Sequence, residues 1–111
     1  MRYLIMIMAL VFALPMYADS NEADRYVREA EYYQKKAESY RREAQYYLNK
    51  SEGYEREAAY YSKKGKADIA RSYRRRAKNA MGSYETQIRY ASRADDQAAD
   101  YLKRAARALE R

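Results

Sequence analysis

A 14-residue repeat is the feature that most constrains how this chain can fold. Three consecutive units start at Arg28, Arg42 and Arg56, and each begins with Arg-Glu-Ala, one variable residue and then Tyr-Tyr. Fourteen residues are two heptads, and the heptad is the period of helices that pack side by side as coiled coils. The repeat therefore predicts a long α-helix with one continuous face committed to a helical partner.

The heptad frame assigns small residues and tyrosines to its two core positions, a and d. The a positions are small throughout: Ala23, Ala30, Ala37, Ala44, Ser51, Ala58 and Gly65. The d positions form an unbroken column of tyrosines: Tyr26, Tyr33, Tyr40, Tyr47, Tyr54 and Tyr61. Bulky residues that face small ones can fill the space between two closely packed helices. We expect these positions to form the core.

The frame breaks at residues 63–68. Lysines followed by Gly65 are typical of a helix end, and Asp68 is typical of a helix start. Beyond the break a second frame places Ala70, Ala77, Tyr84, Ala91, Ala98 and Ala105 at a, and Tyr73, Ala80, Gln87, Ala94, Tyr101 and Ala108 at d. The predicted fold is all-α. It consists of two long antiparallel helices, about 21–64 and about 69–110, which a turn at about 65–68 joins into a coiled-coil hairpin.

Two pairings favour the antiparallel arrangement. If the numbers of facing core residues add to 131, a tyrosine meets an alanine in most layers. Tyr47 with Tyr84 is the one layer of two large residues, and Ala44 with Gln87 is a polar layer. At the flanking g positions, facing residues whose numbers add to 133 carry opposite charges: Glu57 with Arg76, Glu29 with Arg104, and Glu22 with Arg111. Charges at these positions select the orientation of the helices more than they stabilise them.

The first 18 residues have the order of a signal peptide. Arg2 precedes an apolar run over residues 4–14, and a candidate cleavage site follows Ala18. The run is shorter than the roughly 20 residues that span a bilayer, which disfavours a permanent anchor. We therefore expect export to the periplasm or the exterior, with 19–111 as the mature domain. Cleavage after Ala13 and anchoring to the inner membrane by an uncleaved signal are the alternatives.

The large aliphatic residues of the mature domain are concentrated on one flank of the predicted hairpin. Six of them occupy the e positions beside the core: Val27, Leu48, Met81, Ile88, Leu102 and Leu109. In an antiparallel hairpin both e columns lie on the same flank, and an apolar flank without a covering layer indicates an interface. We expect homo-oligomerisation or docking on another helical envelope protein. The alternative is that these side chains only widen the seam between the two helices.

Most of the net charge of +7 falls in residues 65–111, the second predicted helix with its flanking residues, which hold twelve basic and six acidic residues. The candidate anion-binding residues are Arg71, Arg74, Arg75 and Lys78. This basic run suits anionic lipid headgroups, lipopolysaccharide or a cell-wall polymer, and the alternative is a solvated face. Nucleic acid is not expected as a partner, because export is predicted and no nucleic-acid-binding motif is present.

Three tyrosines repeat outside the core. Tyr32, Tyr46 and Tyr60 lie at c positions, 14 residues apart. A tyrosine ring can stack on a sugar or pack against another chain, since it has an apolar body and a polar tip. The alternative interpretation is partial burial against neighbouring side chains.

Catalysis is not expected. The chain contains no His and no Cys, so it lacks the usual general base near neutral pH, the commonest metal ligand and any thiol chemistry. Its one acidic cluster, at 95–100, lacks the loop and the spacing of a calcium site. We expect no enzyme, no cofactor and no metal. The sequence favours a structural or interaction protein.

Overall fold

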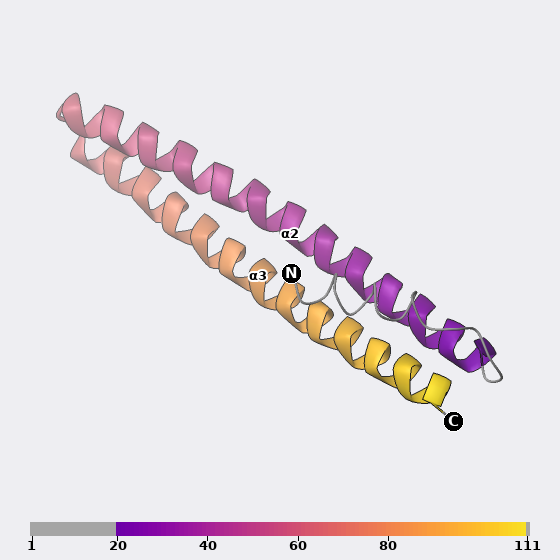
Figure 1. Cartoon of the computed structure of the whole chain (residues 1–111). Helices are drawn as coiled ribbons and strands as arrows, with labels where there is room; N and C mark the ends of the chain where they lie inside the picture. The colour runs from indigo at the N-terminus through magenta and orange to yellow at the C-terminus, as the bar shows by residue number, and fades with distance from the viewer. Residues whose placement is uncertain (1–19, 111) are drawn as a thin grey trace. The chain divides into compact units, whose positions relative to one another are not determined.

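The structure is a computed structural model that describes residues 20–110. Two α-helices of 44 residues make up almost all of this range: α2, Ser20–Lys63, and α3, Ala67–Glu110 (Figure 1). No strand lies within it. The predicted all-α fold with two long helices is confirmed for these residues. The predicted signal peptide, both of its candidate cleavage sites and Arg111 lie outside the described residues.

A glycine turn ends α2. Gly65 has φ +74°, and its N–H donates to the Ser62 carbonyl at 3.1 Å, while the N–H of Lys66 donates to the Tyr61 carbonyl at 2.9 Å. These two bonds satisfy carbonyls that the end of a helix would otherwise leave open. Because α3 begins at Ala67, directly after this turn, Asp68 lies inside its first turn instead of preceding it. The turn is therefore shorter than the predicted 65–68 and starts earlier.

The described residues divide into two compact units. The first, which we call the hairpin unit, is residues 39–90; the second, the terminal unit, combines residues 20–38 with 91–110. In each unit a segment of α2 lies beside a segment of α3 and runs in the opposite direction (Figure 1).

Alanine layers form the core of the hairpin unit. Its buried positions, all at predicted a or d sites, are Ala44, Ser51, Ala58, Ala70, Ala77 and Ala80. Tyrosines at the neighbouring d positions are half-buried and close the seam; Tyr73 stacks on Tyr61 with ring centroids 5.5 Å apart and lies 6.2 Å from Tyr54. This is the arrangement expected from the register that places Ala58 opposite Tyr73.

The terminal unit repeats this pattern with one larger aliphatic residue. Its core cluster contains Ala30, Ala98, Leu102 and Ala105, and Tyr26, Val27, Tyr33 and Tyr101 pack against it. Tyr101 stacks on Tyr33 at 5.7 Å and lies 6.2 Å from Tyr26. Because the a-position alanines present almost no side chain, the half-buried tyrosine rings supply most of the volume at the seam.

The predicted charge pairs between the helices are not formed by Glu57 with Arg76 or by Glu29 with Arg104. The guanidinium of Arg104 instead pairs with Asp100, one turn earlier on its own helix, at 3.2 Å, and lies 5.0 Å from the centre of the Tyr101 ring. The guanidinium of Arg76 lies 5.2 Å from the centre of the Tyr73 ring. Exposed ion pairs contribute little, so a nearby aromatic face competes with them.

Candidate interaction surfaces

In the terminal unit, the predicted interface residues lie largely inside the protein. Leu102 is 1% exposed and belongs to the core cluster, and Val27 packs against that cluster. Leu109 is half-buried. In this unit, alanines at the a positions let the helices approach until the e side chains lie over the seam.

In the hairpin unit the same flank is more open. Leu48 and Met81 are half-buried, whereas Ile88 is 41% exposed. Leu48 and Ile88 line a hollow of about 170 Å³ together with Ala44, Tyr84, and the side chains of Arg41 and Gln45. We call this the apolar hollow. Of the six predicted interface residues, Leu48 and Ile88 are the two that the structure brings together around a hollow.

The predicted basic run lies on the outer face of α3. Arg71, Arg74, Arg75 and Lys78 are all exposed, and their spacing of three, four and seven residues places them on one side of the helix. Arg71 is not available as a free cation, since its guanidinium donates to the Asp68 carboxylate at 2.7 Å. The other three form an exposed basic face.

The outer tyrosines form three copies of one arrangement along α2. Tyr32, Tyr46 and Tyr60 are 53%, 52% and 53% exposed. Each meets the edge of the following tyrosine, with centroids 5.1–5.3 Å apart and rings 68–82° apart. Each also carries the ammonium of the lysine four residues later, 5.2–5.4 Å from its ring centre, as geometry for a cation–π contact requires. About half of every outer ring is therefore covered by its own helix.

In the middle copy, the neighbouring tyrosines also change the titration of the Lys50 ammonium. A hydrogen bond with Tyr46 is the main cause that raises the pKa of its ammonium above the ordinary 10.5, and the nearby Tyr54 and Tyr47 act in the same direction. Lys50 thus keeps its positive charge throughout the neutral range.

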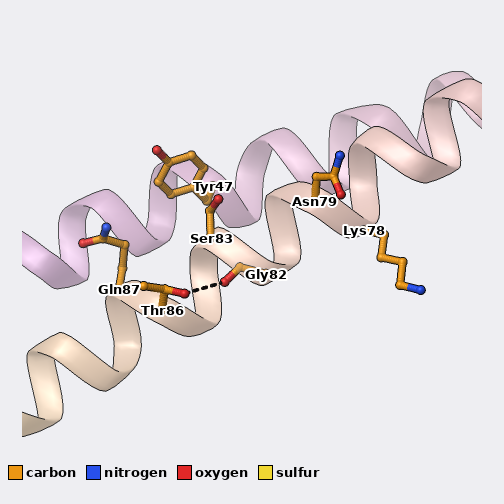
Figure 2. A pocket seen from close by; sticks show the side chains of 7 residues that line it. All are labelled: Tyr47, Lys78, Asn79, Gly82, Ser83, Thr86 and Gln87. Carbon is orange, nitrogen blue, oxygen red and sulfur yellow. Dashed lines mark hydrogen bonds between the residues drawn. The ribbon is translucent and has the colours of Figure 1, made fainter.

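A second hollow, which sequence reasoning missed, lies on the flank of the hairpin unit opposite to the apolar hollow. It has a volume of about 460 Å³ and is lined by one α2 residue, Tyr47, and by a stretch of α3 that includes Gln87 (Figure 2). An adjoining space of about 250 Å³ adds Lys50 and Arg76 to the lining. We call the two together the polar hollow. The available signal was Gln87, a polar residue in a d column otherwise built of tyrosine and alanine.

Within residues 20–110, no group of three His, Cys, Asp or Glu residues is placed to hold a metal ion. Neither described helix has an apolar stretch long enough to cross a bilayer.

Comparison with known proteins adds no relative. No protein family, no curated protein and no solved structure matches this chain.

Proposed function

We propose that this chain is an exported, non-enzymatic coiled-coil hairpin that acts by assembly, docking its apolar flank on a second copy of itself. The observation that carries the proposal is Ile88, a large aliphatic side chain that stands 41% exposed beside the apolar hollow. A singly exposed aliphatic residue such as Ile69 needs no partner, but an exposed aliphatic residue that borders an apolar hollow forms a patch of the kind that marks an interaction site.

The apolar hollow suits a second copy because it offers both halves of one contact. Ile88 is exposed, and the hollow that it lines with Leu48 and Tyr84 can receive the Ile88 of a partner. Two copies related by a twofold axis would fill both hollows at once, which is the geometry of the commonest protein dimers. Burial at the predicted heptad positions supports a coiled-coil seam beneath this flank: from residue 23 to residue 58, every a position of α2 is buried and every d position is half-buried.

A different helical protein of the cell envelope is the second partner that this flank would suit.

Both partners require that this chain is exported, and the proposal of export rests on the signal-peptide order of residues 1–18. N-terminal sequencing of secreted or periplasmic material tests it, with Asp19 as the expected first residue and Leu14 as the alternative. Recovery of an intact Met1 in the membrane fraction would contradict cleavage.

The alternative function is binding of anionic envelope components through the basic face of Arg74, Arg75 and Lys78. The two functions respond oppositely to salt. Apolar docking persists at high ionic strength, whereas attraction between an exposed basic face and lipid headgroups is screened over a Debye length of about 8–10 Å at 0.1–0.15 M salt. Binding to anionic vesicles that disappears with added salt would favour this alternative.

Sedimentation equilibrium of the purified chain, with circular dichroism across a concentration series, tests the assembly. We expect a discrete helical oligomer that melts at a higher temperature when it is more concentrated and that survives about 1 M salt. The decisive variants are Ile88→Ala and its matched control Ile69→Ala, since Ile69 is equally exposed, at 41%, but lies at the start of α3 away from the hollow.

Ile88→Ala should weaken association by about tenfold or more, because a dimer loses the aliphatic side chain twice. Ile69→Ala should leave association unchanged. A folded monomer at micromolar concentration, or equal effects of the two variants, would remove the support for docking through this flank.

A further inference from the structure

The polar hollow occupies the place of a missing tyrosine. In both units a d-position tyrosine of α2 stacks on a d-position tyrosine of α3: Tyr61 on Tyr73 with rings 3° from parallel, and Tyr33 on Tyr101 with rings 10° from parallel. In each stack the two residue numbers add to 134. The same sum pairs Tyr47 with Gln87. Gln87 lies 14 residues after Tyr73 and 14 residues before Tyr101.

At this position the structure has space where the other two have a ring. Tyr47 and Gln87 line the hollow of about 460 Å³, and Figure 2 shows Ser83 next to the Tyr47 ring. Gly82 widens the hollow further, since a Cβ placed there would meet no atom within 4 Å. An amide cannot replace the face of an aromatic ring, so Tyr47 offers the hollow a surface on which a ring-shaped ligand can stack.

Hydrogen-bonding groups also line the hollow. Asn79, Ser83 and Gln87 contribute two amides and a hydroxyl, while the Thr86 hydroxyl is already engaged with the Gly82 carbonyl at 3.0 Å (Figure 2). Together they provide both donors and acceptors. A ligand that carries several hydroxyls matches this lining, whereas a purely aromatic ligand would displace water from these groups without replacing its hydrogen bonds.

The charge of the lining has one sign. Lys50 and Arg76 border the adjoining space, and neither part of the polar hollow is lined by a carboxylate. Lys78 also contributes to the lining, although Figure 2 shows its side chain directed away from the Tyr47 ring. A ligand with negative charge is therefore favoured over a neutral or cationic one.

We propose that the polar hollow binds one ring of an acidic carbohydrate, with the sugar stacked on Tyr47, its hydroxyls bonded to Ser83, Asn79 and Gln87, and its carboxylate directed towards Lys50. An outer tyrosine of a second copy is a poorer occupant. Each of those rings carries a lysine ammonium within 5.4 Å of its centre and would bring a further cation to a basic site. The inference is independent of the proposed assembly, since the polar and apolar hollows share no residue.

The probe is an oligosaccharide of galacturonic acid, added to the full, isotopically labelled chain and followed by NMR. Three further probes separate the parts of the site: the matching neutral galactose oligosaccharide, inorganic phosphate, and 4-hydroxyphenylacetate as an aromatic anion. We expect the acidic sugar to shift the signals of Ser83 and Gln87 and to bind at least tenfold more tightly than the other three. Equal binding of phosphate would mean that charge alone attracts the ligand, and tighter binding of 4-hydroxyphenylacetate would mean that the hollow prefers an aromatic ring; either result overturns the proposal.

The sharpest variant is Gln87→Tyr, which supplies the missing ring. It should close the hollow, raise the melting temperature and reduce binding of the acidic sugar by at least tenfold. Its matched control is Gln97→Tyr, the same change at an exposed site in the terminal unit, which should leave binding unchanged. Retention of binding by a folded Gln87→Tyr protein contradicts the proposal.

Two more variants test single contacts of the site, and neither introduces a larger side chain. Tyr47→Ala removes the stacking surface and should weaken binding about tenfold, and Lys50→Gln should reduce the preference for the acidic over the neutral sugar. Assembly measured by sedimentation is expected to be the same in both variants as in the parent chain. Undiminished binding in Tyr47→Ala would show that the ring does not stack on this tyrosine.

Discussion

Ser51 and Ala77 are joined across the hairpin unit by a buried hydrogen bond, in which the Ser51 hydroxyl donates to the Ala77 carbonyl at 3.2 Å. Ser51 is 4% exposed and stands at the one a position of α2 that interrupts a series of alanines within the helix. A carbonyl inside a helix already accepts a bond from its own chain, so this contact adds to the ladder of α3 without replacing a bond in it.

Ser51→Ala should therefore cost only the net value of one hydrogen bond. We expect a loss of about 0.5–1.5 kcal/mol in the free energy of unfolding, after allowance for the better helix propensity of alanine. Urea denaturation measures this loss. Ser39→Ala, at an exposed site in α2, measures the effect of helix propensity alone and serves as the correction. Equal changes in the two variants would show that the Ser51 bond does not stabilise the fold.

Close packing of the alanine layers predicts a strong difference between two neighbouring residues. Ala58 is 1% exposed, whereas Ala59 is exposed on the outer side of the same helix. Ala58→Leu adds volume to a filled layer and should destabilise by about 1–3 kcal/mol. Ala59→Leu should change stability by less than about 0.5 kcal/mol. Thermal melts of the pair decide whether the seam is as tightly packed as the burial indicates.

Substitution by alanine should change stability in opposite directions at two glycines. Gly65 adopts φ +74°, which an L-residue enters at a cost of about 1–2 kcal/mol, so Gly65→Ala should lower stability. Gly53 lies within α2, where an added Cβ would meet only Arg56 Nη2 at an ordinary 3.9 Å. Gly53→Ala should raise stability by about 0.5–1 kcal/mol. In chemical denaturation, the midpoint of Gly65→Ala should lie below that of the parent chain and the midpoint of Gly53→Ala above it.

The charge of Lys50 predicts a dependence on alkaline pH. Its pKa is raised in the folded chain above the ordinary 10.5, mainly by the hydrogen bond with Tyr46. The groups that face Lys50 are Tyr46, Tyr47 and Tyr54 from α2, and Arg76 from α3 across the polar hollow.

Because a raised pKa favours the charged form in the folded state, the stabilisation by Lys50 is complete below pH 10.5 and disappears as the pH rises through the folded-state pKa. An NMR titration of the Lys50 side chain should show this raised pKa, and Tyr46→Phe should return it towards 10.5. An unchanged titration in Tyr46→Phe would contradict the assigned cause.

The sequence by itself determined the two helices, the turn near Gly65 and the residues of the seam. These features follow from short-range rules, since heptad spacing places a and d side chains on one face whatever lies opposite. The same rules could not separate the six apolar flank residues, and they placed Asp68 before α3 when the tight glycine turn leaves it inside the first turn of that helix.

Only the tertiary structure decided which flank positions close and which stay open. Leu102 is buried because the small residues around it, Ala30, Ala98 and Ala105, leave room for its side chain in the terminal unit. Ile88 has Tyr84 and Arg41 as neighbours around the apolar hollow, and 41% of it remains in solvent. Tyr47 borders a hollow because Gln87 stands where two equivalent positions carry a ring. Exposure at each position depends on the size of the residue that the other helix brings to the same layer, which is a property of register and packing rather than of local sequence.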